Sequence, residues 1–231
     1  YESQVQTPSG QRLDVIFYKS VLRDTEGQVS GLVGTILDIT ERKRMEQQLA
    51  EMATRDPLTG LMNRRAILSH LERLHADRRS QRQPLCLLMC DVDHFKSIND
   101  RHGHAVGDEV LTQVAQVLRQ HLRDGDQVGR IGGEEFLVVL QSTEPEQLAQ
   151  VGERLRQVVA SHPLMSLDTT FSVTLSIGAV RSLRADEDWA SVVSRADQAL
   201  YVAKRTGRDR VVMADSEPPR QLLHKDWHKQ L

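Results

Sequence analysis

Two carboxylates stand at the end of an apolar run that has the length of a β-strand. Residues 85–91 are predicted to form a buried strand, and Asp93 follows Asp91 after a single valine. Alternate strand residues point to the same side of a sheet, so Asp91 and Asp93 are expected to face the same way. Buried charge is costly unless it is paired or bound to a cation, and Mg²⁺ prefers carboxylate oxygens together with substrate phosphates. The pair is a candidate metal clamp, and a helix cap or a salt bridge is the structural alternative.

A second acidic pair follows a Gly-Gly turn. Apolar residues 128–131 and 136–140 flank this turn, which predicts a β-hairpin, and Glu134 and Glu135 come directly after the glycines. If the turn lies beside Asp91, three carboxylates converge and a cation is their natural neutraliser. The spacing does not establish that the two segments are adjacent.

Polar residues that suit a nucleotide follow the first acidic pair. Lys96 is a compact positive charge of the kind that binds phosphate. Asn99 and Asp108 together offer donors and acceptors that match the edge of guanine, although a solvated loop is the alternative. His102 and His104 flank a glycine, but no soft third ligand is nearby, so we expect turn or supporting roles for them rather than zinc binding.

The two cysteines are expected to be core thiols. Cys86 and Cys90 lie in the predicted strand, where four residues span about 13 Å. A disulfide requires Cα atoms within about 7 Å, so this pair cannot form one. We interpret both as free thiols of a protein in a reducing compartment.

The elements that must position these residues alternate between helix and strand. The pattern from residue 56 to about 215 predicts helices at 64–79, 110–121, 146–160 and 189–206, and strands at 85–91, 128–131, 136–140 and 170–180. The sum is an α+β fold with a mixed central sheet and flanking helices.

The first part of the chain follows a different pattern. Residues 10–40 are predicted to form β-strands, and residues 41–55 to form a polar helix. Met45, Leu49 and Met52 give that helix a narrow apolar seam, which fits either an identical helix of a second chain or an exposed connector that packs on its own domain.

Composition excludes several classes. The 231 residues are 39% apolar and 27% charged, which predicts one or two folded domains rather than disorder. Lys and Arg total 30 against 32 Asp and Glu, so we expect neither duplex DNA nor an anionic membrane as a partner. No apolar run approaches the roughly 20 residues of a membrane span, and no signal peptide is visible. We expect a cytoplasmic catalytic part. Because the chain begins at Tyr1 rather than Met, it could belong to a longer, membrane-attached protein.

Taken together, these features resemble the GGDEF family of diguanylate cyclases over residues 54–212. The matching segments, in order, are Asp56-Pro-Leu-Thr-Gly-Leu-Met-Asn-Arg-Arg65, Cys90-Asp-Val-Asp-His-Phe-Lys-Ser-Ile-Asn-Asp100, Gly103-His-Ala-Val-Gly-Asp108, Arg130-Ile-Gly-Gly-Glu-Glu-Phe136, and Ala196-Asp-Gln-Ala-Leu-Tyr-Val-Ala-Lys204 with Gly207-Arg208. The resemblance implies a sheet similar to the palm of nucleotidyl cyclases and polymerases. The signature carries Glu134 where the family usually has Asp, a variant with the same charge that active members also carry.

The resemblance also implies a reaction. Two GTP molecules, each held by one subunit of a homodimer, face each other, and the 3′-hydroxyl of each attacks the α-phosphate of the other. Pyrophosphate leaves and cyclic di-GMP forms, with Mg²⁺ or Mn²⁺ as the cofactor. Pairing the two subunits supplies the orientation that one site alone lacks.

By position, the resemblance assigns roles to individual residues. It implies a metal held by Asp91, Glu134 and the carbonyl group of Val92, and catalytic roles for Glu134, Glu135 and Lys96, with the general base left open between the two glutamates. Its substrate-binding positions are Phe95, Lys96, Asn99, His104, Asp108, Lys204 and Arg208. Asp108 favours guanine over other bases.

A polar turn just before the hairpin has two interpretations. By itself, the turn that contains Arg123 and Asp126 places a positive charge at the end of a helix. In the family this position carries an inhibitory product site, which implies feedback inhibition by cyclic di-GMP bound to Arg123, Asp126 and Arg154. The competing hypotheses are an inactive relative that senses cyclic di-GMP at this turn, and a structural sensor domain that serves dimerisation.

The N-terminal segment resembles the C-terminal part of a PAS sensory domain. This resemblance covers residues 1–42 and ends in Asp38-Ile-Thr-Glu-Arg-Lys43. It implies a helical signalling linker at 43–55, a GGDEF catalytic domain at 56–215 and a polar tail at 216–231.

Overall fold

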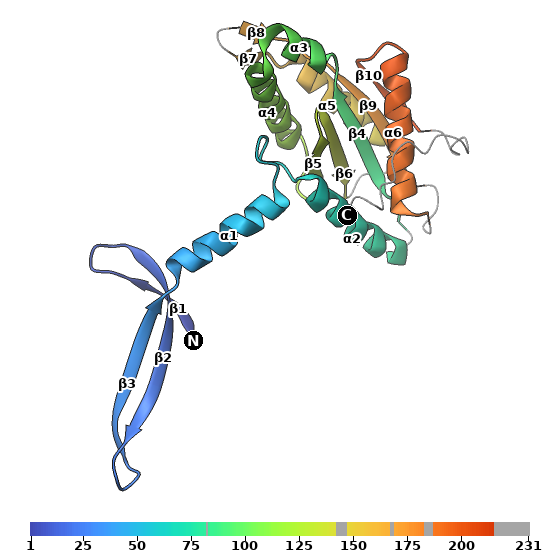
Figure 1. The fold of residues 1–231 in the computed structure, drawn as a ribbon. Coiled ribbons are helices and arrows are strands. Elements are labelled where there is room, and N and C mark those ends of the chain that lie inside the picture. Colours follow the sequence, from blue (N-terminus) through green and yellow to red (C-terminus); the bar gives the residue numbers. More distant parts are fainter. Residues whose placement is uncertain (82, 142–146, 167–168, 183–186, 215–231) are drawn as a thin grey trace. The chain divides into compact units, whose positions relative to one another are not determined.

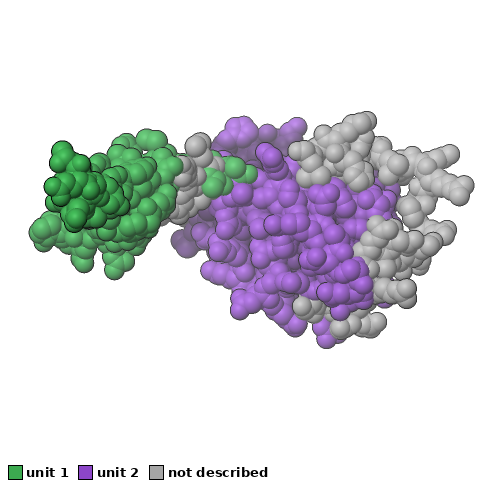
Figure 2. Space-filling view, turned by 90° about the horizontal axis from the view of Figure 1, so that it is seen from below, with its two compact units in different colours: residues 1–53 green, residues 54–231 purple. Residues whose placement is uncertain are grey.

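The computed structural model describes residues 1–81, 83–141, 147–166, 169–182 and 187–214 of the chain. The chain divides into two compact units, Tyr1–Ala53 and Thr54–Leu231, which Figure 2 colours separately. The predicted tail at 216–231 lies outside the described residues. In the part of the chain that the structure describes, no helix has the length and apolarity needed to cross a membrane.

The first unit is an antiparallel sheet followed by a helix. Strands β1 (Glu2–Gln6), β2 (Arg12–Arg23) and β3 (Val29–Asp38) lie in the order β1-β2-β3, and α1 (Thr40–Thr54) follows. The Asp38 carboxylate accepts the N–H of Thr40 at 2.9 Å, and Lys43 pairs with Glu2 at 2.8 Å, so the start of α1 is tied to its own sheet. The predicted strands and helix are confirmed to within a residue or two, whereas β1 was not predicted.

The second unit contains a five-stranded mixed sheet in the order β10-β9-β4-β6-β5. Its strands are β4 (Cys86–Val92), β5 (Gln127–Gly132), β6 (Glu135–Leu140), β9 (Leu175–Arg181) and β10 (Arg210–Met213). Strand β4 is antiparallel to both β6 and β9, and β10 is parallel to β9. Strands β7 (Leu164–Ser166) and β8 (Thr169–Phe171) form a separate ribbon.

Helices cover both faces of this sheet (Figure 1). They are α2 (Arg64–Gln81), α3 (Phe95–His102), α4 (His104–Gln120), α5 (Leu148–Ser161) and α6 (Trp189–Arg205). Leu85, Leu87 and Met89 pack into a core formed with α2 and α6, while Cys86 and Cys90 pack into the core formed with α4 and α5. Strand β4 is therefore buried on both sides, which explains its continuous apolar run. Both cysteines are free and buried, as predicted.

The structure differs from the sequence-based expectations in its short elements. Residues 170–180, predicted as one strand, contain the end of β8 and most of β9, and α3, β7 and β10 were not predicted. Helix α3 has eight residues and no side-chain cap, and its preceding residue, His94, has a left-handed backbone with φ 57°. Neither a start signal nor an apolar period marks so short a helix in the sequence.

Candidate active site

Asp91 lies where the central strand meets the acidic hairpin turn. The residue is 4% exposed, and its Oδ2 atom pairs with Lys204 Nζ on α6 at 2.6 Å. Asp91 is the register partner of Glu135 on β6, and the next N–H, of Val92, points to the carbonyl oxygen of Glu134 at 3.3 Å. The end of β4 at Asp91 and the Glu134-Glu135 turn therefore lie side by side, which the sequence alone did not establish.

This arrangement leaves the Asp91 carboxylate short of positive charge. The pKa of Asp91 is raised from 3.8 to about 6, mainly by burial; the charges of Glu134 and Glu135 also raise it, and the Lys204 ammonium lowers it. One lysine therefore offsets only part of the cost of ionising Asp91 among other acids. A further cation at this point would relieve that cost.

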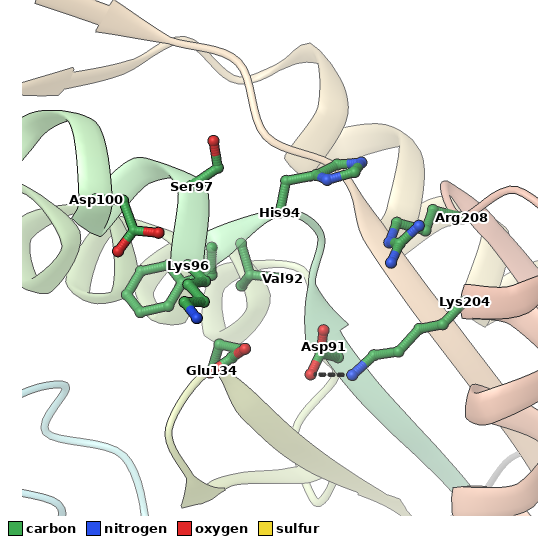
Figure 3. Close-up of a pocket in the computed structure, with 10 residues that line it drawn as sticks. Asp91, Val92, His94, Lys96, Ser97, Asp100, Glu134, Lys204 and Arg208 are labelled. Atoms are coloured by element: carbon green, nitrogen blue, oxygen red, sulfur yellow. Dashed lines mark ion pairs between the residues drawn. The ribbon is translucent and has the colours of Figure 1, made fainter.

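A cavity of about 410 Å³ opens beside Asp91 (Figure 3). Seven predicted site residues line it, namely Asp91, Val92, Phe95, Lys96, Glu134, Lys204 and Arg208. In Figure 3 the Asp91–Lys204 pair, Glu134 and Lys96 surround one space, with Arg208 above the pair. The cavity thus combines carboxylates from β4 and the hairpin with cations from α3, α6 and the turn that follows α6.

Three further lining residues were missed by the sequence analysis. They are His94, Ser97 and Asp100. All three lie within seven residues after Asp93, and this proximity in the chain was the available signal. Helix α3 starts at Phe95 without a side-chain cap, and its Ser97 N–H donates to the His94 carbonyl oxygen at 2.9 Å. The positive end of the helix and the Lys96 ammonium form an environment that favours an anion.

The predicted base-reading residues lie outside this lining, on α3 and the N-terminal part of α4. Asn99 Oδ1 is buried and has no hydrogen-bond partner among the described residues. A Cβ atom at Gly107 would collide with the Asn99 side chain, which shows how closely α4 packs against it. His104 and Asp108 are exposed on α4.

Arg130 holds the acidic turn in place. Its Nε donates to the carbonyl oxygen of Gly133 at 2.8 Å, and its NH1 pairs with Asp56 Oδ1 at 3.2 Å. Arg64 donates to the carbonyl oxygen of Ile131 at 3.0 Å. These guanidinium groups fix the backbone that presents Glu134.

Asp93 is engaged by protein groups rather than by the cavity. Its oxygens accept hydrogen bonds from the hydroxyls of Thr174 and Ser176, both at 2.6 Å, and from the N–H of Asp209 at 3.0 Å. These contacts favour the structural alternative for the second carboxylate of the Asp-Val-Asp pair. His102 lies edge-on against Phe171, which agrees with a supporting role.

The loop between α4 and β5 brings the predicted product-site residues close together. The Asp126 N–H donates to the carbonyl oxygen of Arg123 at 3.1 Å, and Asp126 Oδ1 accepts the N–H of Gln141 at 2.9 Å. Arg154, on α5, donates to the carbonyl oxygen of His121 at 3.2 Å, just before this loop. Arg123 itself is exposed and can contact a ligand.

The donors at the cavity suit a hard cation that also uses substrate oxygens. Within the described ranges, no three His, Cys, Asp or Glu side chains converge into a metal cage. Asp91 and Glu134 supply two carboxylates, and Mg²⁺ is commonly held by one or two carboxylates plus phosphates and water. The residues present therefore fit a magnesium ion that arrives with a phosphate ligand.

Comparisons with known proteins identify the family of the chain. The family profile described as "Diguanylate cyclase, GGDEF domain" matches residues 53–210. A diguanylate cyclase from Vibrio cholerae is 38% identical over 190 residues, which are 82% of this chain and 59% of that protein. Diguanylate cyclase DgcP from Pseudomonas aeruginosa is 45% identical over 164 residues, 71% of this chain and 24% of that protein. The chain thus spans well under two thirds of the length of these relatives.

Solved structures show the same fold. The coiled coil and GGDEF domain of DgcB from Caulobacter crescentus, in complex with c-di-GMP, gives a TM-score of 0.70 at 35% identity, covering 75% of this chain and 93% of that one. The active GGEEF domain of a diguanylate cyclase from Vibrio cholerae gives a TM-score of 0.63 at 38% identity, covering 68% of this chain and 99% of that one. With its mixed α+β sheet and its acidic hairpin beside the central strand, the chain belongs to the diguanylate cyclase GGDEF-domain family.

Proposed function

We propose that this protein is a diguanylate cyclase that condenses two GTP molecules into cyclic di-GMP and two pyrophosphates. The observation that carries the proposal is the cavity in which buried Asp91 and the hairpin residue Glu134 face Lys96, Lys204 and Arg208. Carboxylates suit a divalent cation and the basic groups suit a triphosphate. A site with both signs of charge in one cavity matches a metal-bound nucleotide.

The phosphates are held by groups from α3, α6 and the turn after α6. Lys96 and the first turn of α3 bind them from one side, and Lys204 and Arg208 bind them from the other. Phe95 is buried at the start of α3 and keeps that turn packed on the core. Lys204 pairs with Asp91 in this structure. If a cation bound the Asp91 carboxylate, the Lys204 ammonium would be free to pair with phosphate oxygens.

Base recognition is assigned to the α3–α4 pair. The unpartnered Asn99 Oδ1 accepts from guanine, whose N1 and N2 atoms donate, and Asp108 accepts from the same edge. His104 is the first residue of α4, four residues before Asp108 on the same side of the helix, and it completes this surface. These residues support GTP as the proposed substrate.

Asp91, Glu134 and the Val92 carbonyl group would hold Mg²⁺ or Mn²⁺. When bound, the ion stabilises charge on the α-phosphate and activates the attacking hydroxyl. The general base is Glu134 or Glu135. The chain's own contribution is to keep these acids beside the phosphate cradle and to orient the nucleotide through Lys96, Lys204 and Arg208.

Two substrates must meet, so the cyclase acts as a homodimer in which each catalytic domain presents one GTP. Helix α1 contributes to that assembly, and the strands before it form the end of a PAS-like sensory domain, with α1 as the signalling linker. Cyclic di-GMP binds back at Arg123, Asp126 and Arg154 and inhibits the enzyme, because guanidinium groups recognise both phosphate and guanine.

The test is to incubate the full chain with GTP and MgCl₂ and to identify the product by mass spectrometry. Cyclic di-GMP formation that disappears in Glu134→Gln supports the proposal. The competing function is a receptor, which the α4–β5 loop with its exposed Arg123 also allows. A dimeric preparation that binds cyclic di-GMP in calorimetry but makes none from GTP would establish the receptor instead.

A further inference from the structure

Asp93 is a buried carboxylate that the proposed reaction does not use. It is 4% exposed, follows directly after β4, and is absent from the lining of the cavity. Three donors occupy its oxygens: the Thr174 hydroxyl and the Asp209 N–H share Oδ2, and the Ser176 hydroxyl binds Oδ1. Its own N–H donates to the Thr174 carbonyl oxygen at 2.9 Å. A metal would have to displace several of these bonds to reach this carboxylate.

The Asp209 N–H belongs to a turn with an unfavourable backbone. Arg208 has φ 61° and Asp209 has φ 43°, so two consecutive residues other than glycine are left-handed. Such conformations persist only where surrounding contacts hold them. The contacts here are the bond from Asp209 N–H to Asp93, the bond from Arg208 N–H to the Ala203 carbonyl oxygen at 3.0 Å, and an ion pair between Asp209 and Arg156 at 2.6 Å.

This turn determines where Arg208 lies. Arg208 lines the cavity next to Lys204 (Figure 3), and its backbone is one residue from the bond to Asp93. The sheet register adds a second link, because Ser176 is the partner of Asp91 on one side and of Arg210 on the other. Asp93 therefore joins the strand end that carries Asp91 to the turn that carries Arg208, across β9.

We propose that Asp93 is a positioning residue for the nucleotide triphosphate: it anchors the 208–209 turn so that Arg208 faces the cavity, and it is not a metal ligand. This inference rests on the proposed function for the identity of the nucleotide. The anchoring role explains why residue 93 is a carboxylate: its two oxygens accept hydrogen bonds from the two hydroxyls and the backbone N–H that converge there.

The hydrogen-bond pattern distinguishes an anchor from a ligand. In Asp93→Asn, an amide oxygen at the Oδ2 position would still accept from Thr174 and Asp209, and its NH₂ would donate to Ser176, whose hydroxyl can rotate. The anchor therefore survives in the amide, whereas a metal ligand would not, because the negative charge is lost. Asp93→Ala removes every one of these side-chain bonds.

The experiment compares Asp93→Asn, Asp93→Ala and Asp91→Asn in the full chain. Binding of a non-hydrolysable GTP analogue and binding of Mn²⁺ without nucleotide are measured, the latter by electron paramagnetic resonance. We expect Asp93→Ala to weaken nucleotide binding about 10-fold, as for the loss of a charged hydrogen bond, and Asp93→Asn to restore it to within about 3-fold. Mn²⁺ affinity should be parental in both Asp93 variants and reduced in Asp91→Asn. Asp77→Ala, an exposed carboxylate on α2, is the matched control.

A double-mutant cycle tests whether Asp93 acts through Arg208. On an Arg208→Ala background, Asp93→Ala should cost little further nucleotide affinity, because the two changes remove the same contact. Additive losses would overturn the proposal, and so would an Asp93→Asn variant that loses Mn²⁺ as Asp91→Asn does. If Asp93→Ala does not fold, Thr174→Val with Ser176→Ala, which removes two of the three donors to Asp93, takes its place in the cycle with the same expected loss. None of these measurements needs turnover, so a failure of the cyclase proposal is seen separately.

Discussion

At the scale of single residues, Asp91 is where stability and function oppose each other. Its carboxylate is almost fully buried and lies beside Glu134 and Glu135, with Lys204 as its ion-pair partner. A folded protein tolerates such a charge only where other contacts compensate for it. The same charge is what a divalent cation would use.

The first prediction follows from the pKa of Asp91. Because burial raises it to about 6, folding favours the protonated acid, and this contribution to stability is present below the ordinary carboxyl pKa and lost as the pH rises through about 6. Asp91→Asn, which cannot ionise, should therefore stabilise the metal-free protein by roughly 1–3 kcal/mol at pH 7.5. The gain should shrink at pH 5. Thermal unfolding followed by circular dichroism at both pH values checks this, and a lower melting temperature at pH 7.5 would contradict it.

At the scale of elements, the position of α6 depends on a glycine in β9. A Cβ atom at Gly178 would collide with the backbone of α6 at Ala196 and Leu200. This close approach sets the distance of α6 from the sheet, and α6 carries Lys204 to its 2.6 Å pair with Asp91. Backbone atoms cannot move aside as a flexible side chain can.

We accordingly predict that Gly178→Ala destabilises the fold by about 1–3 kcal/mol through overpacking and weakens nucleotide binding by displacing Lys204. Urea unfolding and calorimetry measure the two effects. The comparison variant is Gly152→Ala, where the added methyl group meets only side-chain atoms, of Val211 and Leu88, the nearest at 3.1 Å. Equal stability of the two variants would show that α6 is free to shift.

The α4–β5 loop supports a third prediction. Arg123 is exposed, while Asp126 and Arg154 are each held by backbone groups near the loop ends. Arg123→Ala should raise the cyclic di-GMP concentration needed for half-inhibition at least about 10-fold, because a bidentate guanidinium contact is lost. Progress curves with and without added product give this value. Unchanged inhibition would remove Arg123 from the proposed product site.

At the scale of the whole molecule, the seam of α1 bears on assembly. Met45 and Met52 are 53% and 68% exposed, whereas the Leu49 side chain lies outside those that the structure describes. Exposed apolar side chains at this spacing favour a partner helix over a connector packed on its own unit.

The fourth prediction is that Met45→Glu with Met52→Glu weakens dimerisation and lowers cyclase activity at least about 10-fold, because charge replaces apolar contact at the seam. Light scattering after size exclusion and the rate of cyclic di-GMP formation report the two effects. The matched control, Met45→Leu with Met52→Leu, keeps the seam apolar. A monomer–dimer balance unaffected by the Glu pair would favour the connector interpretation.

The sequence by itself determined most of the larger elements and the chemistry available to them. The apolar run of β4, the Gly-Gly hairpin and the periodic helices α2, α4 and α6 are encoded by local patterns that burial and turn geometry impose. Residue types and spacing also indicated which side chains could bind a nucleotide, and seven of these line the cavity. Short elements such as α3 and β10 were not predicted, because their stability comes from packing against neighbouring elements rather than from a pattern in their own sequence.

Only the tertiary structure decided how these groups combine. Asp91 meets Lys204 across more than a hundred residues of chain, and Asp93, which the local alternation left as a possible metal ligand, is bonded to β9 and the 208–209 turn instead. The physical reason is that the cost of a buried charge is settled by whichever partners the strand order β10-β9-β4-β6-β5 brings to it. Strand pairing is non-local, so the roles of two aspartates separated by one valine could not be distinguished before the sheet was known.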